Sequence, residues 1–136
     1  MLAPKKTKYR KTQKGRRRKR NIATSRIGIA FGDYGLKAQS FGWVDSRQIE
    51  AARRAITHLL KRKGKMWIRI FPDKAVTAKG AEMPMGKGKG SVDRYVAVVR
   101  SGMILFEIAG VSKDEAKEAM KLAEYKLSIQ CKFISK

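Results

Sequence analysis

The residues best suited to chemistry in this chain form the run Met-Gly-Lys-Gly-Lys-Gly at positions 85–90. Its three glycines let the backbone adopt conformations that other residues avoid, and its two lysines supply long cationic side chains. Backbone N–H groups and ammonium groups arranged in this way can both reach phosphate oxygens along a curved polyanion. The alternative is a flexible connection between two strands, which is the common role of an isolated glycine-lysine loop.

The spacing of this run does not fit a site for a free nucleotide. A Walker loop needs a glycine five residues before its Gly-Lys pair, and counting back from Gly86 and Gly88 gives Ala81 and Met83. A dinucleotide-binding fingerprint also fails, because no helical pattern begins after Gly90. We therefore expect phosphate contact without nucleotide chemistry.

The chain offers no recognisable catalytic or metal-binding set. Its one histidine, His58, lies about seventy residues from its one cysteine, Cys131, and no Cys/His spacing matches a metal site. Cys131 is expected to be a small apolar residue of a strand and His58 a surface residue. The sequence predicts a protein that is not an enzyme and needs no cofactor.

The net charge points to a polyanionic partner. Among 136 residues, 33 Lys and Arg stand against 11 Asp and Glu, which gives a net charge of +22. The first 32 residues hold 12 of these cations and no carboxylate. Such segregated charge favours nucleic acid as the partner, with an anionic membrane surface second, since a merely solubilising surface mixes its signs.

Cysteine usage and hydropathy indicate the compartment. One cysteine excludes an intrachain disulfide framework and fits a reducing compartment. No apolar run approaches 18 residues, and the N-terminus lacks the apolar segment of a secretion signal. A reducing compartment and no secretion are therefore expected.

Residues 1–26 are expected to form an extended basic arm. The segment has too few large apolar side chains to offset the entropy of ordering, so alone it should be disordered. Along RNA it can run through a crevice as an unfolded polycation. The alternative is a disordered solubilising tail. The scarcity of apolar residues also argues against an amphipathic membrane-binding helix.

Residues 45–63 form the strongest helical pattern. Asp45 and Gln48 make a capping box, and Gly64 is expected to stop the helix. One apolar face is predicted, made of Ile49, Ala52, Ile56, Leu59 and Leu60. The opposite face is basic and is relieved only by Glu50, which favours phosphate contact over a merely solvated face; its cations are Arg47, Arg54, Lys61 and Arg62, with Arg53 at the edge.

Short strands are predicted at residues 27–31 and 36–44, joined by a turn at 32–35. Three aromatic residues in them are expected to pack into the core, with stacking on bases as the alternative for each: Phe31, Phe41 and Trp43. Residues 65–71 have apolar side chains on both faces, which predicts a central strand covered on both sides.

The second half of the chain predicts a long loop, a hairpin and a second helix. Residues 73–91 show little regular pattern, and a loop of that length in a compact domain is usually functional or disordered. Residues 92–109 are expected to form a hairpin that turns at 101–102. A capping box at 112–115 opens a helix through about residue 127, with balanced charges, and 129–134 should form the last strand.

Five stretches together resemble one known family: residues 4–11, 31–38, 46–55, 65–74 and 85–90. In order and spacing they are similar to the bacterial and organellar ribosomal protein L-sixteen family, and the likeness covers essentially the whole chain. The resemblance implies a two-layer α+β fold, with two helices on an antiparallel sheet, a basic N-terminal extension and a long glycine-lysine loop. The globular domain would span residues 27–136, with the loop projecting.

The resemblance also implies partners. Members are structural constituents of the large ribosomal subunit, bind its rRNA near the tRNA cleft, and support subunit assembly and peptidyl transfer. The expected partners are large-subunit rRNA, tRNA and neighbouring ribosomal proteins, with no membrane and no homo-oligomer. One departure is Pro84, which replaces an arginine that some bacterial members hydroxylate, so that modification is not expected.

Two sets of residues are predicted to contact RNA. They consist of the positions that match the family motifs and of their neighbours in the same arm, helix face and loop. The rRNA-binding set is Lys5, Lys6, Lys8, Tyr9, Arg10, Lys11, Lys14, Arg16, Arg17, Arg18, Arg47, Arg53, Arg54, Lys61 and Arg62. The tRNA-facing set is Lys79, Met85, Gly86, Lys87, Gly88 and Lys89. From composition alone, the rival function is a free, chromatin-like protein that uses the same arm to bind duplex DNA.

Overall fold

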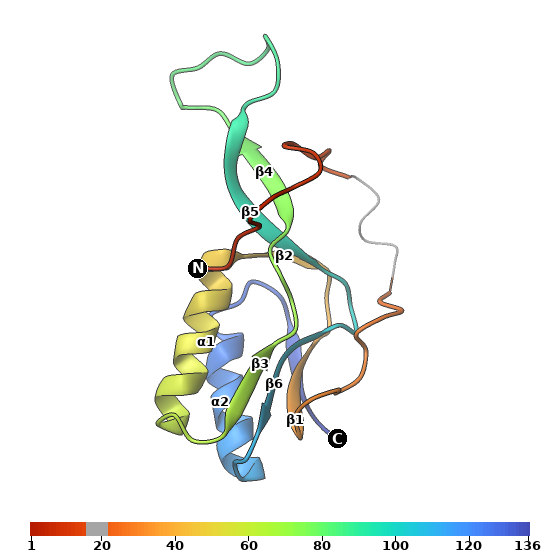
Figure 1. The fold of residues 1–136 in the computed structure, drawn as a ribbon, viewed down its shortest axis with the longest axis vertical. Helices are drawn as coiled ribbons and strands as arrows, with labels where there is room; N and C mark the ends of the chain where they lie inside the picture. Colours follow the sequence, from red (N-terminus) through yellow and green to blue (C-terminus); the bar gives the residue numbers. More distant parts are fainter. Residues whose placement is uncertain (16–21) are drawn as a thin grey trace.

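The computed structural model describes residues 1–15 and 22–136, and in these residues the chain forms two helices and two antiparallel sheets (Figure 1). The first sheet has the strand order β3-β6-β1-β7 and the second β2-β5-β4. The elements are β1 (Tyr34–Ala38), β2 (Gly42–Asp45), α1 (Ser46–Leu60), β3 (Lys65–Ile68), β4 (Lys74–Ala78), β5 (Ser91–Val99), β6 (Ile104–Ala109), α2 (Lys113–Glu124) and β7 (Cys131–Ser135). The predicted α+β class is confirmed.

Helix α1 begins as its sequence predicts. The Asp45 carboxylate accepts a hydrogen bond from the Arg47 N–H at 3.1 Å, and the Gln48 side chain accepts one from the Asp45 N–H at 3.0 Å. The predicted end was wrong, because the helix stops at Leu60 and Lys61 already has a left-handed φ of 51°. The lysine therefore ends the helix three residues before the expected Gly64.

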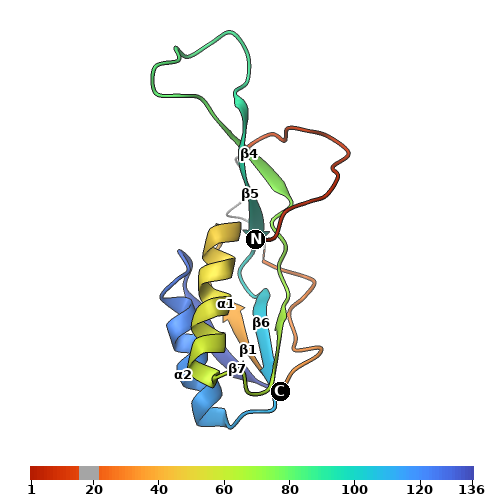
Figure 2. The same ribbon diagram turned by 60° about the vertical axis from the view of Figure 1, so that its left-hand side comes forward.

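Helix α2 is capped by Ser112, whose hydroxyl accepts a hydrogen bond from the Glu115 N–H. The helix ends at Glu124, earlier than the expected 127. The two helices pack against each other and cover one face of the β3-β6-β1-β7 sheet (Figure 2). Their buried residues join those of the sheet in one core; those of the helices are Ile49, Ala52, Ile56, Leu60, Ala116, Ala119, Met120 and Ala123.

Strands β4 and β5 form a ribbon that extends away from the helices and ends in the loop at residues 79–90 (Figure 1). The interpretation of 73–91 as irregular was therefore wrong for its first part, since Lys74–Ala78 is a strand. Its small and β-branched residues pair with Ser91–Val96 of β5. The irregular segment is shorter than predicted, and it lies at the far end of the ribbon.

Residues 92–109 do not form the predicted hairpin. Strand β5 pairs with β2 and β4, whereas β6 pairs with β1 and β3 in the other sheet. At the turn between them, the Gly102 N–H bonds to the Ala38 carbonyl and the Ile104 N–H bonds to the Arg26 carbonyl. These long-range partners replace the hairpin, and alternation along the chain could not reveal them.

Strand β3 is an edge strand, so the prediction of a central strand at 65–71 was wrong. Only one of its faces is packed on the core, through Met66 and Ile68. The strand predicted at 27–31 is absent, and Tyr34 and Gly35 lie inside β1 instead of a turn.

Two of the three aromatic residues expected in the core, Phe41 and Trp43, are only half-buried. Phe31 is 61% exposed. The expected core positions were therefore wrong, most clearly for Phe31.

Cys131 is buried at the start of β7, as expected for a small apolar strand residue. Burial, and secondarily the charge of Glu124, raise the pKa of its thiol to about 12. A thiol with so high a pKa is almost wholly protonated at neutral pH, so it is a poor nucleophile. Among the described residues, no helix is long and apolar enough to cross a membrane.

Candidate nucleic-acid interface

The first 15 residues run beside the ribbon of β4 and β5 (Figures 1 and 2). The Lys11 ammonium donates to the Lys89 carbonyl at 3.1 Å, and the Lys89 ammonium donates back to the Thr12 carbonyl at 2.9 Å. Nearer the domain, the Thr12 hydroxyl donates to the Ala75 carbonyl, and the Lys74 ammonium donates to the Lys14 carbonyl at 2.8 Å. Segments about seventy residues apart in the sequence thus share one surface.

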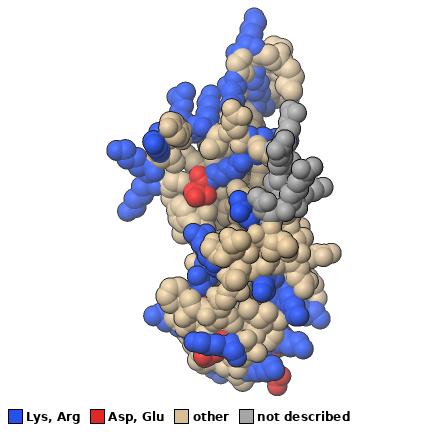
Figure 3. Space-filling model, turned by 90° about the vertical axis from the view of Figure 1, so that its right-hand side faces the viewer, with Lys and Arg blue, Asp and Glu red and all other residues tan. Residues whose placement is uncertain are grey.

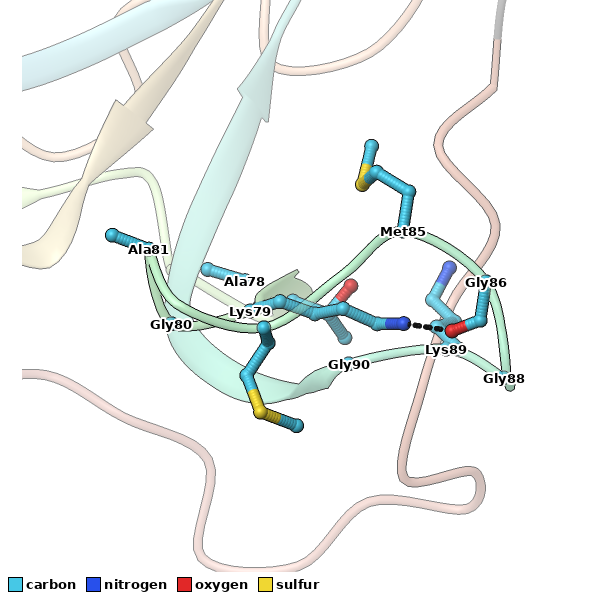
Figure 4. A pocket seen from close by; sticks show the side chains of 11 residues that line it. Ala78, Lys79, Gly80, Ala81, Met85, Gly86, Gly88, Lys89 and Gly90 are labelled. Atoms are coloured by element: carbon cyan, nitrogen blue, oxygen red, sulfur yellow. Dashed lines mark hydrogen bonds between the residues drawn. The ribbon is translucent and has the colours of Figure 1, made fainter.

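The loop at 79–90 has few contacts of its own. The Lys79 ammonium donates to the Gly86 carbonyl across the loop (Figure 4), and Met85 is 93% exposed. Gly86 and Gly88 both have a φ of +102°, a conformation that side chains disfavour, and a methyl group at either position would meet nothing within 4 Å. The loop therefore presents backbone and lysines to its surroundings without a packed support.

The outer face of α1 carries a second basic surface. Arg47, Arg54, Lys61 and Arg62 are exposed, while Arg53 is half-buried at the edge of the face. The one carboxylate there, Glu50, is bound by Arg53 at 2.5 Å and by Arg54 at 3.2 Å. The hydrogen bond from Arg53, together with the charges of both arginines, lowers the pKa of Glu50 to about 2. A phosphate reaching these arginines must compete with a carboxylate that stays ionised at neutral pH.

The predicted site residues thus fall into two groups. Arm and loop lie along the ribbon, and the arm starts beside the first turn of α1 in both ribbon views (Figures 1 and 2). The remaining predicted residues lie on the α1 face. Seen from the side of the arm, lysine and arginine side chains are spread over the whole length of the molecule, with few carboxylates among them (Figure 3). Arg16, Arg17 and Arg18 lie outside the described residues.

Sequence reasoning missed a buried carboxylate on the opposite face of the sheet from the helices. Glu107, in β6, is fully buried; its Oε1 accepts hydrogen bonds from the N–H groups of Ala30, Phe31 and Gly32 at 2.8, 3.0 and 3.3 Å. Its Oε2 accepts one from the Arg69 guanidinium at 2.5 Å. The signal was present in the sequence, since Glu107 is the one charged residue of the strand Ile104–Ala109.

Although burial by itself raises the pKa of Glu107, the Arg69 guanidinium and the three backbone donors outweigh it and leave the pKa below its usual value. The carboxylate is therefore ionised and has four donors. This arrangement fixes the backbone around Phe31, which lies on the surface.

Comparison with known proteins gives one consistent result. A family model described as ribosomal protein L16p/L10e matches residues 4–134. The chain belongs to this family. It is 61% identical to the large ribosomal subunit protein uL16c of Cyanidium caldarium, over 99% of this chain and 95% of the relative. It is 54% identical to the large ribosomal subunit protein uL16 of Heliobacterium modesticaldum, over 100% of this chain and 93% of the relative.

Membership of the L16p/L10e family confirms the resemblance inferred from the five sequence stretches. It identifies the chain as a ribosomal component with a structural and not a catalytic role, as the sequence predicted. The family match spans the described part of the arm from residue 4, the ribbon, the loop and both helices. The roles of individual side chains in these regions stay predictions.

Proposed function

We propose that this chain is a structural constituent of the large ribosomal subunit that holds rRNA with its arm and the α1 face and presents the 79–90 loop to tRNA. Its relatives of 61% and 54% identity carry the name of large-subunit proteins. The single observation that carries the proposal is the joint surface of arm and loop, where the ammonium groups of Lys11, Lys74 and Lys89 each donate to a backbone carbonyl of the other segment.

The charge of that surface supports rRNA as the partner. Cations held this close together repel one another in the free protein, and a polyphosphate backbone relieves this repulsion. Lys and Arg contacts to phosphate also release counterions, which makes binding strong at low salt. Within the described part of the arm, the cations assigned to rRNA are Lys5, Lys6, Lys8, Arg10, Lys11 and Lys14, with Tyr9 among them.

Different properties support tRNA as the partner of the loop. A ligand that enters and leaves in every elongation cycle requires a surface that is exposed and not committed to a permanent partner. The loop lies at the far end of the ribbon from the helices (Figure 1), and its glycines leave its backbone open to phosphates. Lys79, Lys87 and Lys89 are the cations assigned to this contact, with Met85, Gly86 and Gly88.

The test begins with sedimentation of the tagged full chain in a sucrose gradient at high salt. The chain should travel with the large subunit, and recovery only at the top of the gradient would contradict the proposal. Competition between duplex DNA and a folded rRNA fragment then separates it from the chromatin-like rival, which predicts equal or tighter DNA binding.

The role of the arm is tested by the salt dependence of rRNA affinity. Changing Lys5, Lys8, Arg10 and Lys11 to Gln should reduce the slope of log affinity against log salt by about 0.9 for each lost phosphate contact. A matched control changes four cations of α2 and its flank to Gln: Lys113, Lys117, Lys121 and Lys126. An unchanged slope in the arm variant would remove the arm from the interface, and an equal reduction in both variants would show a general effect of net charge.

A further inference from the structure

Four side chains form a continuous row on the face of the sheet that the helices do not cover. The Lys65 ammonium lies 5.4 Å from the centroid of the Trp67 ring. The Trp67 and Phe31 rings are stacked with centroids 6.0 Å apart and planes 21° apart, and the Arg69 guanidinium carbon lies 5.1 Å from the Phe31 centroid. We call this row the Phe31–Trp67 platform; it has a cation at each end and two aromatic rings between them.

The strand geometry places three of the four residues together. Side chains at every second position of a strand share a face, so Lys65, Trp67 and Arg69 lie on one side while Met66 and Ile68 pack on the core. Because β3 lies at the edge of the sheet, no strand among residues 1–15 and 22–136 pairs with its outer side.

Phe31 comes from a different part of the chain and is held there by the buried carboxylate. Trp67 and Glu107 are direct cross-strand partners, and Glu107 binds both the Phe31 N–H and the Arg69 side chain. Gly32, next to Phe31, lies so close to β6 that a methyl group there would be 2.7 Å from the Ile108 carbonyl oxygen. The position of the exposed ring is thus set by buried contacts.

The exposure of the Phe31 ring is the opposite of what the hydrophobic effect alone would give. A phenylalanine that is 61% exposed leaves most of its apolar surface in water, although the segment carrying it is firmly bound to the sheet. A ring fixed in an exposed position loses little further freedom when a flat ligand stacks on it, so binding costs less conformational entropy.

We propose that the Phe31–Trp67 platform stacks an unpaired RNA base, while the exposed Lys65 ammonium contacts a phosphate next to it. Every base has a flat π face, so this site requires a single-stranded nucleotide but no particular sequence. The inference rests on the proposed function only in taking RNA as the ligand; it adds a second mode of binding, by ring stacking, outside the arm and loop.

Charge favours RNA over a peptide at this site. Lys65 is an exposed cation at one end of the platform, whereas the charge of Arg69 at the other end is paired with the buried Glu107 carboxylate. An acidic peptide would use the Lys65 ammonium but would leave the stacked rings without a planar partner. A nucleotide can contact both the cation and the rings, because its base and its phosphates are adjacent.

The first experiment measures stacking in solution with the full chain. In a Trp43→Phe background Trp67 is the one tryptophan, and its fluorescence should be quenched when an oligoadenylate of about eight nucleotides binds. An abasic oligomer of the same length and charge is the matched probe, since it keeps the phosphates and lacks the rings. Equal quenching and equal affinity for the two oligomers would overturn the proposal.

The second experiment compares two exposed phenylalanines. Phe31→Ala should weaken oligoadenylate binding by about five- to a hundredfold and leave binding of the abasic oligomer unchanged. Phe71→Ala, which removes a ring that is 44% exposed and outside the platform, should change neither. Phe31→Trp should restore the affinity. Equal losses for Phe31→Ala and Phe71→Ala would contradict the assignment.

The third experiment identifies the partner in the assembled subunit. With p-benzoylphenylalanine in place of Phe31, irradiation should crosslink the chain to rRNA. A crosslink only to a neighbouring protein would assign the platform to a protein interface and overturn the inference. This failure is distinct from failure of the proposed function, which would appear as an unchanged salt slope after neutralising the arm.

Discussion

Two irregular surface segments, residues 27–33 and 79–90, show how differently an exposed stretch can be held. Both contain glycines and both are largely exposed. The first is bound through three N–H groups to the buried Glu107 carboxylate, and the Asp33 N–H bonds to the Ile108 carbonyl. The second has a lysine–carbonyl bond across it, one lysine–carbonyl bond in each direction between Lys89 and the arm, and open space around Gly86 and Gly88.

The difference indicates what each segment can recognise. A ring held at a fixed position suits a ligand of fixed shape, such as a flat base, because little entropy is lost on binding. A glycine-rich loop with few supports can adapt to a curved and changing phosphate backbone, at the cost of ordering on binding. We therefore expect mutations at the two segments to separate into effects on stability and effects on ligand binding.

The largest expected effect comes from removing the buried carboxylate. Glu107→Ala should lower the free energy of unfolding by about 3–5 kcal/mol, because Arg69 and three backbone N–H groups lose a buried partner. Urea unfolding at neutral pH measures this. Glu82→Ala, at a carboxylate of the 79–90 loop, is the control and should change stability by less than about 0.5 kcal/mol. Similar losses in both variants would contradict the conclusion that segment 27–33 is held more firmly than the 79–90 loop.

A matched pair of glycines gives the next effect. Gly32→Ala should cost about 1–3 kcal/mol, because its methyl group would lie 2.7 Å from a backbone oxygen of β6. Gly88→Ala should cost less than about 1 kcal/mol although its φ is +102°, because the loop is free to change its backbone angles. Thermal unfolding of both variants checks the order. A larger loss for Gly88→Ala would mean that the loop is held as rigidly as segment 27–33.

Acid should loosen the first segment selectively. Because the folded pKa of Glu107 lies below its ordinary value of 4.5, its contribution to stability is fully present above that value and is lost as pH falls through the folded pKa. Unfolding free energies measured from about pH 6 down to about pH 2 should therefore fall less steeply in Glu107→Gln than in the unmodified chain. Parallel curves would show that this carboxylate does not control acid stability.

The smallest effect on stability is expected in the loop. Lys87→Ala combined with Lys89→Ala should change the unfolding free energy by less than about 0.5 kcal/mol, since both side chains are exposed. The same variant should enter large subunits normally and reduce tRNA binding or the translation rate. Sedimentation and tRNA filter binding measure the two properties. Loss of subunit incorporation would instead make the loop an rRNA anchor.

Local sequence was sufficient for features that depend on a few neighbouring residues. The Asp45–Gln48 capping box, the Ser112 cap and the buried face of α1, apart from the half-buried Leu59, were predicted correctly, because a cap and a helical face are set by residues within one or two turns. The interpretation of Cys131 as a buried strand residue was also correct. The family followed from motif order and spacing.

Predictions failed where a residue's partner lies far away in the chain. The alternating pattern of 92–109 is the same whether two strands pair with each other or with separate sheets, so the hairpin was wrong. The apolar residues at 65–71 gave no sign that β3 would be an edge strand. Phe31 was placed in the core because hydrophobicity alone does not tell which rings are left outside.

The sequence by itself determined the charge, the helices and the family of this protein. Its net charge of +22, with 12 of the 33 cations in an arm without carboxylates, already favoured a polyanionic partner. Only the tertiary structure decided that the arm lies beside the glycine-lysine loop, and that a buried glutamate from β6 holds Phe31 on the surface. Composition is a sum over residues, whereas these contacts join residues more than seventy positions apart and exist only once both sheets have formed.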